Sequence, residues 1–258
     1  MSYVTVSALS HEGLVREHNE DSLTVGPWTL CATVTGNPQT LLFPLGGPGA
    51  AAPPCVVAVA DGLGGHPGGE VASSLVARRL ASTGSELDGE QAVREALHTC
   101  NRAVYEAAGS APELTAMGTT VAGIVLLPAS VVVFNVGDSR VYAVASDGLR
   151  RLSVDDSPPL APGQRTTSVV TQSLGGSDAL TVVEPHVETV PLAPGDRFLV
   201  CSDGLTDPVP DGGLLEVLSR SREESERADG RAAFELWRSA IEAGGPDNIT
   251  LALVRVSG

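Results

Sequence analysis

Lysine is absent from this chain, and arginine supplies all 16 of its basic residues. Against them stand 31 acidic residues, which gives a formal net charge of −15 at neutral pH. A chain with so few cations repels nucleic acid and anionic lipid, so we expect neither as a partner. The absence of lysine itself is more typical of genome base composition than of a function.

Long apolar runs and paired cysteines are also missing. No run reaches the roughly 20 residues that a membrane-spanning helix needs, and the N-terminus opens on a strand-like alternation instead of a secretory signal. Cys31, Cys55, Cys100 and Cys201 are widely separated, so no CxxC pair predicts a zinc or redox site. We therefore expect reduced, mostly buried thiols in a cytoplasmic protein.

Aromatic residues are scarce, at 3%, whereas hydrophobic residues make up 42% of the 258 positions. Valine, leucine and alanine must therefore fill the core. Helical spacing of apolar residues predicts helices over 69–82, 90–108 and about 222–243. Apolar or alternating runs predict strands over 3–9, 22–25, 28–33, 55–60, 119–127, 131–136, 140–145, 149–152, 169–171, 180–190, 197–201 and 248–256.

Strands come in groups that are separated by helices, which favours an α+β fold over strict βαβ alternation. We predict a four-layer α-β-β-α sandwich with two central antiparallel sheets. The motifs described next lie far apart in sequence and meet only if the whole chain folds together, so we predict a single domain over 1–258. Residues 35–54, rich in glycine, proline and alanine, are expected to form a loop, and the proline-rich residues at about 157–169 a short surface flap.

Three acidic elements carry the strongest chemical signal. Asp61 lies in VVAVADGLGGH, Asp203 in FLVCSDGLTD and Asp247 in GGPDNITLALV, each at one end of an apolar, strand-like run. This layout brings carboxylates from separate strands to one edge of a core. Several hard oxygen ligands without a Cys or His cluster select Mg²⁺ or Mn²⁺.

Structural roles for these elements remain open. DGLGGH is also compatible with a plain glycine turn that an Asp caps, whereas a dinucleotide loop matches poorly because Pro67 occupies the third glycine position. Asp207 is either the cap of a following short helix, which we favour, or an extra ligand.

Two further elements have similar ambiguity. Asp138 lies in the hairpin VFNVGDSRVY, where an Asp that merely closes the turn is a strong alternative. Arg16, Glu20 and Asp21 lie close together near the N-terminus. An arginine among acids usually forms a solvated salt bridge, but beside a metal cluster it would bind phosphate with its two-pronged guanidinium.

Taken in order, the motifs resemble the metal-dependent protein phosphatases of type 2C. They are RxxNED, DGLGGH, MGTT (Met117 to Thr120), GDSR, DDS (Asp155 to Ser157), CSDGLTD and GGPDNIT. Each motif alone is weak, but seven in order are specific, and they span the chain from about Gly13 to its end. The resemblance implies a sandwich of two antiparallel sheets flanked by helices.

The resemblance also implies a role for each matching residue. Asp61, the Gly62 carbonyl, Asp203 and Asp247 resemble the ligands of a two-metal centre, in which Asp61 bridges both ions. Glu20 and Asp21 resemble acids that hold metal-bound waters, and Asp138 with Asp203 resembles the ligands of a third, weaker ion. Arg16 resembles the phosphate-binding arginine and His66 the proposed general acid. The MGTT segment would support the site.

The implied reaction is hydrolysis of phosphoserine or phosphothreonine by a hydroxide that bridges two Mg²⁺ or Mn²⁺ ions, with no phosphoenzyme. Phosphorylated proteins would be the partners, the chain would oppose Ser/Thr kinases, and we expect a monomer. Two alternatives stay open: a protein that only binds phosphoproteins, and a hydrolase of small phosphoesters. The flap is shorter than in most bacterial members, which bears on substrate selection and on affinity for the third ion.

Overall fold

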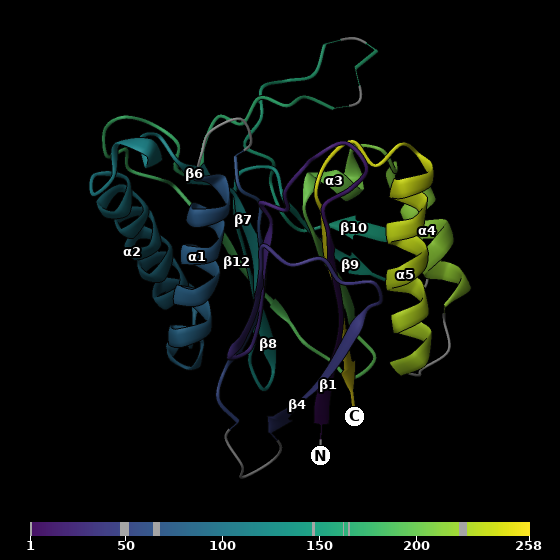
Figure 1. The fold of residues 1–258 in the computed structure, drawn as a ribbon. Coiled ribbons are helices and arrows are strands. Elements are labelled where there is room, and N and C mark those ends of the chain that lie inside the picture. The colour runs from purple at the N-terminus through teal and green to yellow at the C-terminus, as the bar shows by residue number, and fades with distance from the viewer. Residues whose placement is uncertain are drawn as a thin grey trace.

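Two β-sheets lie face to face, and helices cover both outer faces (Figure 1). The computed structural model describes residues 2–46, 52–63, 68–145, 148–161, 163–164, 166–221 and 226–258, to which all structural statements refer. The four layers confirm the predicted α-β-β-α sandwich. The two termini lie next to each other at one end of the sheets, opposite the end that carries the flap.

Each large sheet has six antiparallel strands. The first has the order β10 (Leu149–Arg151), β9 (Arg140–Val144), β13 (Arg197–Cys201), β14 (Ile249–Ser257), β1 (Ser2–His11) and β4 (Gln39–Gly46). The second has the order β12 (His186–Pro191), β8 (Ser130–Val136), β7 (Val121–Leu126), β5 (Cys55–Ala60), β2 (Ser22–Val25) and β3 (Trp28–Cys31). A small ladder pairs β6 (Gly118–Thr119) with β11 (Leu174–Gly175).

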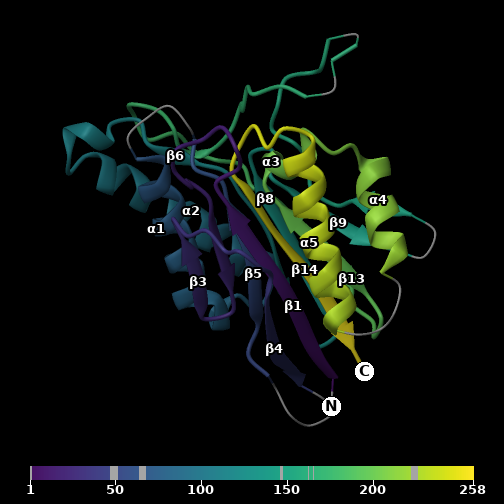
Figure 2. The same cartoon turned by 45° about the vertical axis from the view of Figure 1, so that its right-hand side comes forward.

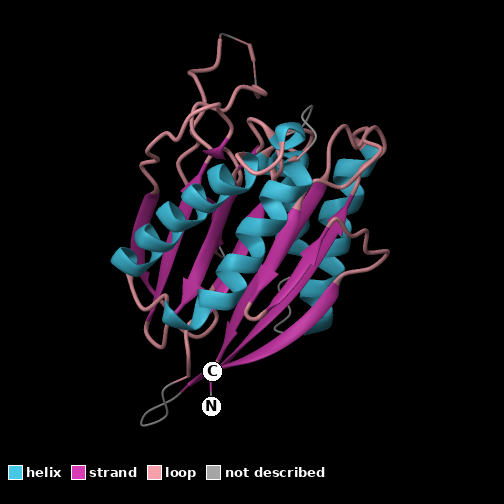
Figure 3. Cartoon of the chain, turned by 60° about the vertical axis from the view of Figure 1, so that its left-hand side comes forward, coloured by secondary structure: helices cyan, strands magenta, loops and turns pink. Residues whose placement is uncertain are grey.

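The helices divide between the two outer faces (Figures 2 and 3). α1 (Gly69–Thr83) and α2 (Glu90–Ala108) cover the second sheet, with the short 3₁₀ turns η1 (Gly84–Glu86) and η2 (Pro112–Leu114) after them. α3 (Asp203–Thr206), α4 (Asp211–Arg220) and α5 (Glu226–Glu242) lie on the side of the first sheet. None of the helices in these ranges combines the length and apolarity that crossing a bilayer requires.

Alternating side chains build three apolar layers. On β5, Val57 and Val59 point into the space between the sheets, whereas Val56 and Ala58 point toward α1 and α2. The whole of β5 is buried, which confirms the prediction from its uninterrupted apolar run. Three of the four cysteines are buried and all four are free thiols, as expected.

The prediction of a loop over 35–54 is wrong for its central part, because Gln39–Gly46 forms β4. This strand pairs only with β1 and lies at the edge of its sheet. An edge position tolerates Pro44, whose missing amide hydrogen would weaken an inner strand. The flanking glycines and prolines hid a strand whose pairing partner lies far away in the sequence.

Two predictions about the C-terminal helices also need correction. The helix expected over about 222–243 is α5, and a separate helix, α4, precedes it. Asp207 does not cap the start of a helix; it follows the last turn of α3, and Pro210 occupies the N-cap of α4. The glycines at the start of α4 have low helix propensity, so its burial of Leu214 and Leu218 stabilises it instead.

The strand expected over 180–190 is shorter, because only His186–Pro191 pairs with β8. Upstream, Thr181 is held by α2: Asn101 Nδ2 donates to its carbonyl at 2.8 Å, and its hydroxyl lies 2.7 Å from Tyr105 Oη. No strand forms over 169–171. The flap residues that the structure describes between 157 and 169 have no helix or strand, and they project from the end of the sandwich (Figure 1).

Candidate metal centre

Carboxylates from both sheets gather at the end of the sandwich opposite the termini. Asp21 directly precedes β2 and Asp61 directly follows β5 in the second sheet. Asp203 follows β13 and Asp247 precedes β14 in the first sheet. Neighbouring antiparallel strands end and begin at the same edge, so strand order brings the two acids of each sheet together. The face-to-face packing of the sheets then brings the two pairs close to each other.

Asp21 is the most deeply buried of these acids, at 1% exposure. Its Oδ2 accepts a hydrogen bond from Ser202 Oγ at 2.8 Å, which links the two sheets. Its Oδ1 has no hydrogen-bond partner among the described residues. A buried carboxylate oxygen without a partner is costly, and it is the kind of atom that a cation or its water would satisfy.

The Met117–Thr120 segment supports Asp61 through the backbone. The Asp61 carbonyl accepts hydrogen bonds from Thr119 Oγ1 at 2.7 Å and from the Thr120 amide at 2.9 Å. Thr120 Oγ1 also lies 2.8 Å from Ser139 Oγ, next to Asp138. The segment therefore joins the two turns that present Asp61 and Asp138, in line with its expected supporting role.

Close backbone packing explains two of the glycines that follow the acids. A Cβ on Gly62 would lie 2.5 Å from the carbonyl group of Gly69 and 2.7 Å from the Glu20 carbonyl oxygen. A Cβ on Gly204 would lie 1.9 Å from the Asn248 carbonyl oxygen. Only glycine fits at either position, so both Asp-Gly pairs serve the approach of separate segments as well as the turn.

Asn248 anchors the N-terminal loop that carries Arg16, the candidate phosphate-binding residue. Its Oδ1 accepts from the Glu20 amide at 2.8 Å, and its Nδ2 donates to the carbonyls of Glu12 at 3.0 Å and His18 at 2.8 Å. Its own amide donates to Asp247 Oδ1 at 2.8 Å. The role of Asn248 in holding residues 12–20 has no local signal in the sequence.

Arg16 lies at the open side of the cluster and pairs with Asp247. The distance from Nη2 to Oδ2 is 2.7 Å, and the two side chains are 42% and 35% exposed. This hydrogen bond is the main reason that the pKa of Arg16 is raised. The structure thus joins two residues for which the sequence predicts different roles, phosphate binding and metal binding.

Burial and mutual repulsion raise the pKa of Asp21, Asp61 and Asp203. Burial raises the pKa of Asp61 well above its ordinary value, and Asp21 and Asp203 add to the effect. The pKa of Asp21 rises to about 7, mainly through burial and then through Asp203 and Asp247. The pKa of Asp203 is raised by burial and by Asp247. Cations that offset the negative charge would therefore favour the ionised form of these acids.

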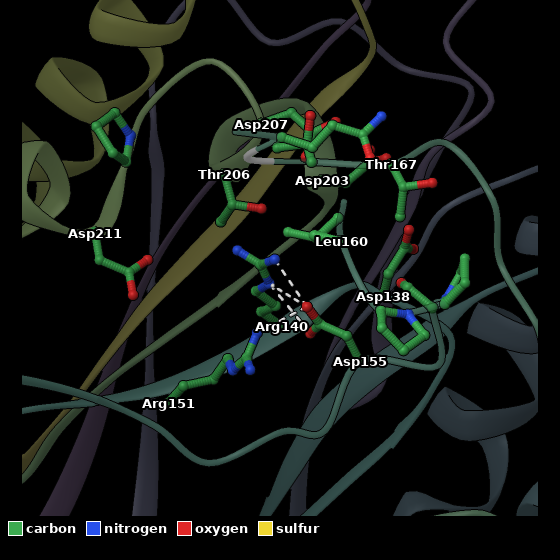
Figure 4. A pocket seen from close by; sticks show the side chains of 16 residues that line it. Asp138, Arg140, Arg151, Asp155, Leu160, Thr167, Asp203, Thr206, Asp207 and Asp211 are labelled. Atoms are coloured by element: carbon green, nitrogen blue, oxygen red, sulfur yellow. Dashed lines mark hydrogen bonds and ion pairs between the residues drawn. The ribbon is translucent and has the colours of Figure 1, made fainter. Parts of the chain in front are cut away.

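Asp138 lies in the β8–β9 turn and faces a cavity of about 680 Å³ that adjoins the cluster (Figure 4). Asp203, Asp207 and Thr206 also line this cavity, and Thr206 Oγ1 has no partner among the described residues. Burial, followed by repulsion from Asp203, raises the pKa of both Asp138 and Asp207 to about 7. Asp207 therefore lies beside the candidate site, which favours the alternative of an extra ligand over that of a helix cap.

An ion pair forms another wall of the same cavity. Arg140 Nη2 lies 2.8 Å from Asp155 Oδ2, and Arg151 Nη1 lies 2.7 Å from the same oxygen (Figure 4). Pro158, Leu160 and other flap residues complete the lining. The DDS motif thus holds the start of the flap against the GDSR turn, which is a structural role the sequence does not reveal.

Glu20 and His66 are the two remaining predicted residues, and the structure describes only Glu20. The pKa of Glu20 is raised by burial first, and Glu70 also contributes. A Cβ on Gly69 would lie 2.9 Å from Glu20 Oε2, so this carboxylate lies against the start of α1. His66 lies outside the described residues, and its role as general acid stays a prediction.

The donor set suits hard divalent cations: many carboxylates, raised pKa values and an unpartnered buried oxygen on Asp21. In the described part of the chain, however, no three Asp, Glu, His or Cys side chains form a finished ion cage. The Arg16–Asp247 pair explains part of this, because it turns one candidate ligand toward a guanidinium. The residues therefore fit hard divalent cations chemically, after local side-chain rearrangement.

Comparisons with known proteins identify relatives of this chain. The sequence profile described as "Protein phosphatase 2C" matches residues 49–236. The serine/threonine protein phosphatase PstP of Mycobacterium tuberculosis is 31% identical over 265 residues, covering 97% of this chain and 44% of PstP. The serine/threonine phosphatase stp of Listeria monocytogenes is 34% identical over 218 residues, covering 77% of this chain and 83% of stp.

A solved structure resembles the whole chain. The crystal structure of the PstP catalytic domain in complex with two manganese ions has a TM-score of 0.78 and 31% identity, and the match covers 100% of both chains. The present chain spans less than half the length of full PstP, at 44%.

Proposed function

Because this chain belongs to the protein phosphatase 2C family, we propose that it is a metal-dependent phosphatase acting on phosphoserine and phosphothreonine in proteins. The convergence of buried, mutually repelling carboxylates from both sheets supports this most directly. The relatives' names and the manganese-bound PstP domain support the same activity.

We assign the metal ligands by combining the motif order with the geometry. Asp61, the Gly62 carbonyl, Asp203 and Asp247 would hold two Mg²⁺ or Mn²⁺ ions, Glu20 and Asp21 would hold their waters, and Asp138 with Asp203 would hold a third ion. Asp207 lines the same cavity as Asp138 and would add a third carboxylate to that site. When bound, the ions would supply positive charge and a water whose pKa is lowered toward neutrality.

Arg16 would bind the phosphoryl oxygens and offset the charge that develops during transfer. Its Nη2 contacts Asp247 in this structure, so a phosphoryl oxygen that takes this nitrogen would compete with the ion pair. His66 would protonate the departing serine or threonine oxygen. Cys201 is fully buried, and burial raises its pKa to about 12, so it does not serve as a nucleophile.

Residues 1–258 would act as one catalytic unit, which the full-length match to the PstP catalytic domain supports. Free thiols are consistent with a cytoplasmic location, where the chain would reverse the action of Ser/Thr kinases. The monomeric state stays a prediction.

The test is phosphate release from a phosphothreonine peptide with Mn²⁺, with a chelator, and after Asp203→Asn. We expect activity only with Mn²⁺, and a loss of about a thousandfold in the variant, since a metal's charge stabilisation is worth several kcal/mol. Asp196→Asn is the matched control, because the Asp196 side chain accepts a hydrogen bond from the Ala193 amide in a loop remote from the site. Activity that survives chelation and Asp203→Asn would sink the proposal.

Two other outcomes identify the alternatives. A wild type that binds Mn²⁺ and phosphopeptide without releasing phosphate would be a binding protein. Turnover of para-nitrophenyl phosphate without turnover of any phosphopeptide would indicate a hydrolase of small phosphoesters.

A further inference from the structure

Asp156, the second acid of the DDS motif, lies where three separate segments meet. Its Oδ2 accepts hydrogen bonds from the Gly137 amide at 2.8 Å and from Gln172 Nε2 at 2.9 Å. Its Oδ1 lies 2.9 Å from His186 Nε2. One carboxylate therefore contacts the GDSR turn, Gln172 and β12. Asp156 and Gln172 flank the flap, and we call these two positions its proximal and distal roots.

The backbone of Asp156 joins the same segments. Its amide donates to the Gly137 carbonyl at 3.0 Å, and its carbonyl accepts from the Thr171 amide at 2.7 Å. Gly137 is thus held from both sides by one residue. Because Asp156 directly precedes the flap and Thr171 follows it, the hydrogen bond between them ties the two ends of the flap together.

Neighbouring side chains extend the connection. Asn135 on β8 donates from Nδ2 to the Val154 carbonyl at 2.6 Å and accepts from the Val154 amide at 3.1 Å. Gln172 accepts from the Glu184 amide at 2.6 Å and donates to the Glu184 carbonyl at 3.2 Å. The flap roots are therefore anchored to β8 and to the segment before β12.

The turn that Asp156 holds is sterically demanding. Gly137 has φ +101°, and a Cβ there would lie 2.6 Å from the Thr120 side chain. Asp138 follows immediately, and its carboxylate faces the cavity beside Asp203 (Figure 4). A turn in this conformation aims Asp138 only if its hydrogen bonds keep it in place.

We propose that Asp156 is a positioning residue that fixes the Gly137–Asp138 turn and couples it to both roots of the flap. This inference rests on the proposed function, since it assigns Asp138 to the site that binds metal. Asp156 does not face the cavity, and its side chain is only 13% exposed. It therefore acts through Asp138, and a displacement at either flap root changes the aim of that carboxylate. The coupling is reciprocal: binding of an ion at Asp138 stabilises the flap roots.

Matched substitutions separate this role from general stability. Asp156→Ala removes all three side-chain contacts, whereas Asp156→Asn keeps an oxygen for the Gly137 amide and offers an NH₂ group to His186. Gln172→Ala removes the contact with the distal root and leaves the Gly137 bond intact. Asp196→Ala is the control, since it removes one loop-capping carboxylate remote from the site.

The first readout is amide hydrogen exchange in chelator-treated protein, which needs no phosphatase activity. We expect exchange at Gly137 to accelerate about tenfold or more in Asp156→Ala, as the loss of a hydrogen bond implies. Asp156→Asn and Asp196→Ala should stay near wild type, and Gln172→Ala should affect Thr171 more than Gly137. Mn²⁺ should slow exchange at Thr171 in the wild type but not in Asp156→Ala.

The second readout is the Mn²⁺ concentration that gives half-maximal phosphatase activity, with kcat and KM measured separately. Asp156→Ala should raise that concentration and lower kcat about tenfold with recovery in Asp156→Asn. Unchanged Gly137 exchange in Asp156→Ala, or equal losses in Asp156→Ala and Asp196→Ala, would overturn the inference.

If Asp156→Ala does not fold, Gln172→Ala decides: no change at Thr171 and no change in the Mn²⁺ requirement would refute the coupling. A wild type without phosphatase activity would refute the proposed function, whereas the exchange at Gly137 would still test the role of Asp156.

Discussion

Charged residues lie at both ends of the strands β13 and β14. The two ends differ in how far cations of the protein offset their carboxylates. At the end near the termini, Asp229 on α5 is 1% exposed and pairs with two arginines. At the other end, Asp203 and Asp247 lie among further acids, and Arg16 is the only cation that pairs with either of them in the described residues. One end balances a buried carboxylate within the protein, and the other keeps several carboxylates unbalanced.

The balanced end is a structural network. Arg255 Nε and Nη2 donate to the two oxygens of Asp229 at 2.5 and 2.9 Å. Arg197 Nη2 lies 2.6 Å from Asp229 Oδ1, and its Nη1 donates to the Leu218 carbonyl at 3.1 Å. These contacts fasten α4 and α5 to the first sheet. The unbalanced end has no such closure, which is what a site for external cations requires.

The largest stability effect should come from breaking the balanced end. Asp229→Asn leaves two buried guanidinium groups without a counter-charge, which we expect to cost about 3–5 kcal/mol of the free energy of unfolding. Denaturant unfolding with a chelator present measures it. Glu235→Gln on the same helix, which breaks an exposed pair with Arg238, should cost at most about 0.5 kcal/mol. Similar losses in the two variants would contradict the contrast between the ends.

At the unbalanced end, removal of a charge should have the opposite sign. Asp203→Asn removes a buried carboxylate whose pKa is raised by burial and by Asp247. In chelator we expect the free energy of unfolding of the variant to be about 1–3 kcal/mol higher than that of the wild type, because an unpaired buried charge destabilises the fold. The same variant should lose activity. A destabilised Asp203→Asn protein would mean that the acid contributes to folding.

The sequence predicts those parts of the contrast that neighbouring residues encode, and it does not predict those that depend on distant segments. Asp61, Asp203 and Asp247 each follow or precede a recognisable apolar run, so local pattern predicts their convergence. The roles of Asn248 and Asp156 depend on contacts with segments far away along the chain, and no local pattern encodes them.

The errors in the fold have the same physical origin. β4 is a strand because β1 offers it a free edge, and α4 is a helix because Leu214 and Leu218 find an apolar surface. In both cases tertiary packing outweighs weak local propensity. Asp207 looked like a cap because its surroundings resemble a helix start, whereas α3 ends there.

The pH dependence of stability sharpens the comparison further. Burial and neighbouring acids raise the pKa of Asp21 and Asp138 to about 7, above the unfolded value of about 3.9. The folded chelator-treated protein therefore binds more protons than the unfolded chain between these values. The contribution of these two acids to stability should be greatest below about pH 4 and should be lost as pH rises through 7.

We expect the fall between pH 5 and pH 8 to exceed about 1.4 kcal/mol, the equivalent of one pKa unit. Urea unfolding at several pH values measures it, and saturating Mn²⁺ should flatten or reverse the slope. If stability rose with pH in chelator, cations of the protein itself would already offset the negative charge of the cluster, and the contrast between the ends would be wrong.

The smallest effect on stability at the unbalanced end should come from Arg16, which pairs with Asp247. Arg16→Ala breaks an ion pair whose side chains are 42% and 35% exposed, so we expect a change below about 1 kcal/mol in unfolding. The KM for a phosphothreonine peptide should nevertheless rise about tenfold or more, because a charge-assisted bond to phosphate is lost. Arg16→Lys, which keeps the charge without the two-pronged geometry, should recover part of that loss. Bound Mn²⁺, measured by titration, should stay unchanged or tighten, since Asp247 is released. A loss of Mn²⁺ in Arg16→Ala would instead mean that Arg16 holds the acids in place, and that the protein balances part of this end itself.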